Sequence, residues 1–87
     1  MKSKTTRDFW DGFDALPVEE QDRAREAYGL WRDNPNHPSV HFKRVSRKFP
    51  IYSVRIGLHY RSLGLRDGDT ITWYWIGSHA EYDKLLK

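Results

Sequence analysis

Residues that could act on a charged ligand are concentrated in the stretch from Tyr52 to Tyr82, around which we expect the rest of the chain to be organised. Arg55 and Arg61 lie on successive predicted strands, and a His79-Ala80-Glu81-Tyr82 cluster follows the last strand. A small sheet needs such mixed strands if one face rests on helices and the other binds a charged ligand. The spacing of three between the histidine and the tyrosine lets both side chains emerge together at the end of that strand.

The basic residues are unevenly distributed along the chain. Residues 1–33 hold six Lys or Arg against eight Asp or Glu, a net charge of −2, whereas residues 34–87 hold nine against four, a net charge of +5. No acidic residue occurs between Asn34 and Arg66. The basic residues of this interval and its boundary are Lys43, Arg44, Arg47, Lys48, Arg55, Arg61 and Arg66, with His37, His41 and His59 among them. This distribution is typical of a polyanion-binding face.

An alternative for the same charges is an ordinary solvated surface. Arg55 and Arg61 would then form ion pairs with acids elsewhere in the chain, the available partners being Asp67, Asp69 and Glu81.

Length and composition predict one domain over residues 1–87 with a single core. A chain of 87 residues buries only about 60–65% of its unfolded surface, so a partner could contribute to its stability. The absence of cysteine excludes a disulfide framework and a thiolate zinc site. His37 and His41 are separated by Pro38, which removes the helix that would align them, so we expect no metal site and no cofactor. No apolar run approaches a membrane span, and a cytoplasmic location is the expectation.

The first half of the chain predicts a helical hairpin. Thr5 and Thr6 are candidate caps for a first helix whose apolar residues share one face, and Leu16-Pro17 ends it. Pro17 suits the first turn of a second helix that runs to about Asp33. Both aromatic stripes follow the helical period, which indicates core rather than a binding box.

The second half predicts strands over Val40 to Ser46, Ile51 to Gly57, His59 to Leu65 and Thr70 to Gly77. A hairpin turn at residues 66–69 joins the last two, and the last strand is expected to be central or near-central. Ser78 and Glu81 match a capping box that opens a short terminal helix. The predicted fold is therefore α+β: an N-terminal helical hairpin packed on a twisted antiparallel sheet of three to four strands, with a short C-terminal helix.

These elements resemble the RelE/ParE superfamily of toxins from bacterial type II toxin–antitoxin systems. The resemblance covers nearly the whole chain, and its informative part is the arginine-bearing pair of strands in YSVRIGLHYRSLGL followed by IGSHAEYDKLL. The family usually begins with a strand ahead of the hairpin. Only about six polar residues precede the first helix here, so that strand is expected to be short or missing.

The resemblance implies a sheet face that holds mRNA and a cognate antitoxin protein as partner. Several members cleave mRNA, often on the ribosome, by driving the 2′-hydroxyl onto the adjacent phosphate to leave a 2′,3′-cyclic phosphate, and so inhibit translation. Others bind and poison DNA gyrase without RNA chemistry. The predicted function is an mRNA endoribonuclease toxin that needs no metal ion. The alternatives are a gyrase poison, an inactive binding protein of this fold, and a nucleic-acid-binding domain without toxicity.

The resemblance also implies roles for particular residues in that cleavage. Arg55 and Arg61 match family arginines suited to stabilising charge on the phosphorane oxygens. His79 matches a C-terminal histidine and is the best general acid or base, because an ordinary imidazole titrates near neutrality. Tyr82 could stack on a base, donate a proton, or simply anchor the terminal helix. Glu81 is a possible base, although capping is its expected role. The residues expected to hold the RNA backbone are Lys43, Arg44, Arg47 and Lys48. Trp73 and Trp75 are expected to pack against the sheet.

Overall fold

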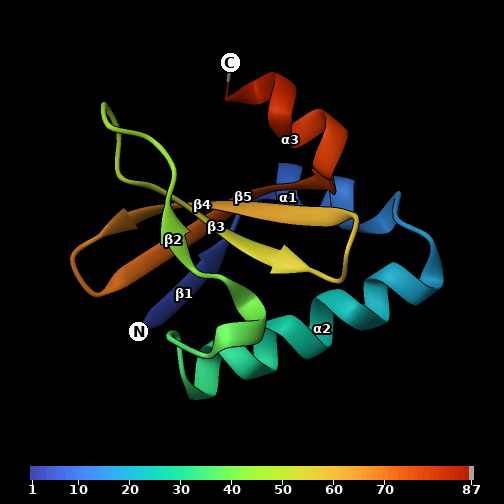
Figure 1. Ribbon diagram of the computed structural model, residues 1–87, viewed down its shortest axis with the longest axis horizontal. Helices are drawn as coiled ribbons and strands as arrows, with labels where there is room; N and C mark the ends of the chain where they lie inside the picture. The colour runs from blue at the N-terminus through green and yellow to red at the C-terminus, as the bar shows by residue number, and fades with distance from the viewer. Residues whose placement is uncertain (87) are drawn as a thin grey trace.

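The computed structural model describes residues 1–86 and contains a five-stranded sheet in the order β1-β5-β4-β3-β2 (Figure 1). Helix α2 lies on one side of this sheet and α3 on the other (Figure 1). None of the helices within these residues is both long and apolar enough to cross a membrane. The elements in chain order are β1 (Lys2–Thr5), α1 (Arg7–Asp14), α2 (Val18–Asp33), the 3₁₀ turn η1 (Pro38–Val40), β2 (Lys43–Arg44), β3 (Ile51–Ile56), β4 (Tyr60–Asp67), β5 (Thr70–Ser78) and α3 (His79–Leu85).

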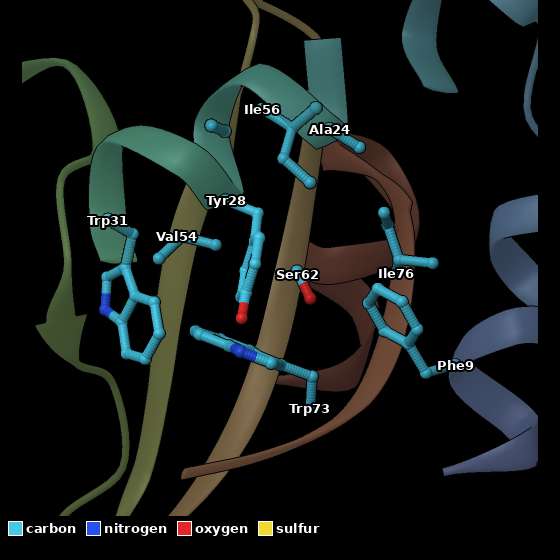
Figure 2. Close-up of a pocket in the computed structure, with 10 residues that line it drawn as sticks. Phe9, Ala24, Tyr28, Trp31, Val54, Ile56, Ser62, Trp73 and Ile76 are labelled. Atoms are coloured by element: carbon cyan, nitrogen blue, oxygen red, sulfur yellow. The ribbon is translucent and has the colours of Figure 1, made fainter. Parts of the chain in front are cut away.

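The hydrophobic core lies between the helical hairpin and one face of the sheet. Trp31 of α2 packs edge-to-face on Trp73 of β5, with ring centroids 5.4 Å apart, and on Phe42, 5.7 Å away. A cavity of about 40 Å³ remains beside these rings, and Figure 2 shows Tyr28, Ser62 and Trp73 converging on it. It is large enough for a water molecule but not for a nucleotide, so any substrate must bind outside the core.

Strand β1 corrects the expected strand count, because residues 2–5 form an edge strand and bring the sheet to five strands instead of three or four. β1 pairs in parallel with β5, from Lys2 opposite Thr70 to Thr5 opposite Trp73. Side chains reinforce this pairing: Ser3 Oγ lies 2.9 Å from the Tyr28 hydroxyl, and Trp10 Nε1 donates to Thr5 Oγ1 at 2.8 Å. The family's first strand is therefore present, in a segment whose composition is polar.

The hairpin forms as its sequence predicts. The Thr6 hydroxyl caps α1 by accepting from the Phe9 N–H at 3.2 Å. The helix ends at Asp14, shortly before Pro17, and Gln21 Nε2 donates to the carbonyls of Phe13 and Leu16 at 3.1 and 3.3 Å. Helix α2 then runs to Asp33 as expected.

The predicted strand over Val40 to Ser46 is wrong in most of its length. The His37 imidazole accepts from the Ser39 N–H and opens η1, which takes in Val40, and His41 then adopts a left-handed φ of 46°. Only Lys43 and Arg44 remain to pair with β3. The other predicted strands lie within two residues of their expected ends, and Gly68 turns the β4–β5 hairpin with a φ of 60°. β5 lies between β1 and β4, as predicted for a near-central strand.

Gly12 provides a test of how α1 packs on β5. A Cβ at this position would stand 2.8 Å from the Ile76 carbonyl oxygen, so we expect Gly12→Ala to destabilise the protein by about 1 kcal/mol or more even though alanine is the better helix former. Gly29→Ala is the matched control, because nothing lies within 4 Å of its Cβ position. That change should stabilise the protein by about 0.5–1 kcal/mol. Urea unfolding measures both, and equal effects of the two changes would contradict the close packing of α1.

Candidate functional site

Two arginines stand directly opposite each other on neighbouring strands. The register pairs Arg55 of β3 with Arg61 of β4, and Arg61 in turn with Gly77 of β5. Because Ser62 lines the core cavity, alternation directs Arg61 to the opposite face of the sheet, and the Arg55 side chain starts on that same face before it turns to the edge of β3. Like charges directly opposite across two strands destabilise a sheet. Here the two side chains turn apart, because Arg55 Nε donates to the Gly57 carbonyl and Arg61 lies over the Tyr82 ring.

The ion-pair alternative for these arginines is wrong within residues 1–86. None of the four ion pairs in that part of the chain includes Arg55 or Arg61. The Arg61 guanidinium instead lies over the Tyr82 ring, 5.2 Å from its centroid, and its Nε and Nη1 atoms are buried without a hydrogen-bond partner among the described residues. An aromatic ring attracts the cation but leaves its N–H donors unused. Arg61 is therefore held against the Tyr82 ring with two buried N–H donors that no group within residues 1–86 satisfies.

Helix α3 brings the histidine and the tyrosine to this arginine. Its capping box forms as predicted: Ser78 Oγ accepts from the Glu81 N–H, and the Glu81 carboxylate accepts from the Ser78 N–H at 3.2 Å. The His79 N–H donates to the His59 carbonyl at 2.7 Å, which ties the start of α3 to the β3–β4 turn. The His79 and Tyr82 rings then meet edge-to-face with centroids 5.6 Å apart. Arg61, His79 and Tyr82 thus form one cluster, named the arginine–histidine cluster below.

Asp83 is a member of this site that sequence reasoning missed. Its Oδ2 lies 3.2 Å from His79 Nδ1. A carboxylate on one ring nitrogen fixes the tautomer and leaves the other nitrogen for a substrate. The spacing of four residues on a helix was the signal that could have found it. Since the Glu81 carboxylate is engaged in capping, Asp83 is the acid that accompanies the histidine.

Arg55 is separated from this cluster by the direction of its side chain. Its Nε donates to the Gly57 carbonyl at 2.9 Å, and the side chain borders a depression that it shares with residues of α2 and η1. The backbone of Arg55 is thus adjacent to Arg61, whereas the Arg55 side chain lies at the outer edge of β3, where it forms its hydrogen bond.

The four predicted backbone-binding residues are not equivalent. Lys43 lies opposite Ser53, and alternation places it on the same face as Arg55. Arg44 points to the other face and braces the following loop, with Nε donating to the Ser46 carbonyl at 2.8 Å. Arg47 and Lys48 are exposed in that loop. Lys43 is therefore the member of this set that lies on the sheet face of the cluster.

A bulge separates the two tryptophans of β5. Trp73 pairs with Gly64 and is buried in the core, whereas Trp75 pairs with Leu63, the preceding residue of β4, and so lies on the cluster's face. Simple alternation would put both rings on one face, so no sequence pattern predicts this difference. The Trp75 indole lies across Gly77: a Cβ there would stand 2.6 Å from Trp75 Cζ2. The extra residue is Tyr74, and burial raises the pKa of its hydroxyl.

Comparison with solved structures shows the fold class. The chain superposes on a toxin of the RelB–RelE antitoxin–toxin complex from Methanococcus jannaschii with a TM-score of 0.76 at 14% identity, covering 97% of this chain and 99% of that one. YafQ from Escherichia coli gives a TM-score of 0.73 at 8% identity, with 93% and 96% of the two chains covered. A YoeB/ParE toxin from Agrobacterium tumefaciens gives 0.70 at 14%, with 91% and 99% covered. No curated protein sequence matches the chain. The fold is that of the small α+β toxins typified by RelE.

The family follows from the sequence match. The model of the ParE-like toxin domain matches residues 19–84, which is most of the chain. The chain belongs to this family and is a toxin of the RelE/ParE-like superfamily of toxin–antitoxin systems. The resemblance inferred from the strand pair and the terminal IGSHAEYDKLL segment is thereby confirmed.

Within residues 1–86 the structure contains no group of three His, Cys, Asp or Glu side chains that could hold a metal ion.

The contact between Arg61 and Tyr82 can be measured by a double-mutant cycle. Arg61→Met and Tyr82→Leu retain aliphatic bulk but remove the cation and the ring respectively. Because the guanidinium is partly buried, we expect a coupling energy of about 0.5–2 kcal/mol in chemical unfolding. Tyr82→Phe is the control and should preserve the coupling, since the ring face is unchanged. A coupling energy of zero would contradict the contact between the Arg61 guanidinium and the Tyr82 ring.

Proposed function

We propose that this toxin is an mRNA endoribonuclease that acts by 2′-hydroxyl attack and inhibits translation in the cytoplasm. The observation that carries the proposal is the Arg61 guanidinium, whose buried Nε and Nη1 lack a partner among the described residues and which lies over the Tyr82 ring, itself in contact with His79. A cation with unused donors next to an imidazole and a phenol is what phosphoryl transfer from a ribose oxygen requires.

Each group has a role in the reaction that its contacts support. The 2′-oxygen forms a bond to phosphorus, the bond from phosphorus to the 5′-oxygen breaks, and the product carries a 2′,3′-cyclic phosphate. An N–H at His79 Nδ1 donated to Asp83 leaves Nε2 as an acceptor for the 2′-hydroxyl proton. Tyr82 is the group placed to protonate the leaving 5′-oxygen, and Arg61 binds the phosphorane oxygens. Since the arginine supplies the positive charge, these steps need no metal ion.

A cognate antitoxin is the proposed protein partner. The RelE-type relative from Methanococcus jannaschii is an antitoxin–toxin complex, and this chain shares its fold over nearly the whole length. An unneutralised arginine face favours a covering segment that is acidic or otherwise competes with RNA.

Mapping of RNA ends tests the reaction. Purified protein added to a translating extract should produce 2′,3′-cyclic phosphate ends, and Arg61→Gln and His79→Ala should each lower cleavage by at least about 100-fold. Arg66→Gln is the matched control, because Arg66 lies on the same strand but on the other face, over the Tyr52 ring. It should retain cleavage.

The alternative of a non-catalytic toxin predicts a different result. The family match is to ParE-like domains, and gyrase poisoning remains the competing activity for such a fold. Growth arrest with intact mRNA, unaffected by His79→Ala, would contradict the ribonuclease proposal and direct attention to DNA gyrase.

A further inference from the structure

An open depression of about 590 Å³ lies at the outer edge of β3. It is bordered by α2, by η1 and by the turn that joins β3 to β4. The side chains that could carry charge there are Arg23, Glu26, His41 and Arg55. Three of these four are basic residue types, and they come from three separate parts of the chain.

The two arginines converge on Gly57. Arg55 Nε donates to the Gly57 carbonyl at 2.9 Å. On the other side of the glycine, the position that a Cβ would occupy is 3.0 Å from Arg23 Cδ and 3.8 Å from Arg23 Nε. Gly57 has a φ of +57° and carries no side chain, so it admits both arginines at the same turn. Arginine side chains from α2 and β3 therefore meet at one peptide, with the Glu20 carboxylate 3.6 Å from the same Cβ position.

The edge of β3 is open beside Arg55. β2 pairs with β3 only at Lys43–Ser53 and Arg44–Tyr52, so no strand stands opposite Arg55. The left-handed backbone of His41 turns the chain away at this point and leaves its imidazole at the rim of the depression. Anionic ligands can reach such an edge without displacing a strand.

Only some of the charges at the depression take part in ion pairs. Arg23 forms an ion pair with Glu20, and Glu26 lies at the rim, whereas Arg55 takes part in no ion pair within residues 1–86. Glu26 and Arg55 are therefore the two charges left without an ion pair within residues 1–86, and the positive one lies on the guanidinium fork of Arg55, a group that matches phosphate geometry.

We infer that this depression is a second phosphate subsite, which binds the backbone phosphate next to the one that is cleaved. The inference rests on the proposed function. Arg55 and Arg61 are opposite each other in the register, so an RNA strand that crosses from β4 to β3 meets the arginine–histidine cluster first and the depression next. In this account Arg55 positions the substrate through the flanking phosphate, and Arg61 is the arginine at the reacting phosphorus.

Salt-dependent binding of a 2′-O-methyl RNA hexamer, which cannot be cleaved by 2′-oxygen attack, tests the subsite. Each lost phosphate contact lowers the slope of log K against log salt by about 0.7 for a single strand. We expect that decrease for Arg55→Gln and for Arg23→Gln, measured by fluorescence anisotropy. Arg32→Gln is the matched control, since Arg32 is an arginine of the same helix with a similarly exposed side chain, 62% against 54% for Arg23. It should leave the slope unchanged.

Glu26→Gln keeps the test decisive if loss of the Glu20 partner impairs folding of Arg23→Gln. Removal of the Glu26 carboxylate should tighten binding of the hexamer. A 2′-O-methyl dinucleotide has a single phosphate, which occupies the arginine–histidine cluster, so it should bind to all of these variants with equal affinity. If Arg55→Gln and Arg23→Gln keep the salt dependence of the wild-type protein, the subsite is overturned. It is also overturned if these variants lose antitoxin binding but bind RNA as before. The subsite is tested by binding, whereas the proposed reaction is tested by mapping of RNA ends. An absence of cleaved ends would therefore overturn the reaction without bearing on the subsite.

Discussion

The pairing of β4 with β5 is the constraint on which both faces of this protein depend. Its register places Gly64 against Trp73 and Leu63 against Trp75, so one bulge sends the first ring into the core and the second to the opposite face. The same ladder sets Arg61 beside Gly77, immediately before the strand ends in Ser78 and α3 begins. The core and the arginine–histidine cluster are thus two consequences of one strand pairing.

The cluster has features that lower the stability of the free protein. Two arginines are opposite each other in the register of β3 and β4, although their side chains turn apart, and guanidinium N–H groups of Arg61 are buried without a hydrogen-bond partner among the described residues. Opposed like charges and unsatisfied buried donors both disfavour folding. The Tyr82 ring offsets part of this cost through its contact with the cation. Such an arrangement is typical of a site whose electrostatic energy is recovered when an anionic ligand binds.

Features with local signals were predictable from the sequence. The capping box at Ser78 and Glu81, the Thr6 cap and the turn at Gly68 each depend on residues that are close in the chain, and all three form. The two arginine-bearing strands and the terminal helix followed from these signals. So did the meeting of His79 with Tyr82, because their spacing is fixed by the helix.

Features that depend on distant parts of the chain were not predictable. β1 is polar and forms only because β5, more than sixty residues later, offers it an edge. The expected strand from Val40 was lost because the His37 side chain caps a 3₁₀ turn at Pro38. The bulge at Tyr74 reverses the face of Trp75, and Arg23 comes close to Gly57 only through the packing of α2 on the β3–β4 turn. None of these contacts leaves a periodic pattern in the sequence.

A crystal structure of the protein with uridine vanadate would test the central claim most directly, because five-coordinate vanadium imitates the phosphorane of 2′-hydroxyl attack. The account predicts vanadate oxygens within hydrogen-bond distance of Arg61, with His79 on the side of the 2′-oxygen and the Tyr82 hydroxyl on the opposite side. Vanadate bound away from this face, or bound there with Arg61 still directed only at the Tyr82 ring, would contradict it.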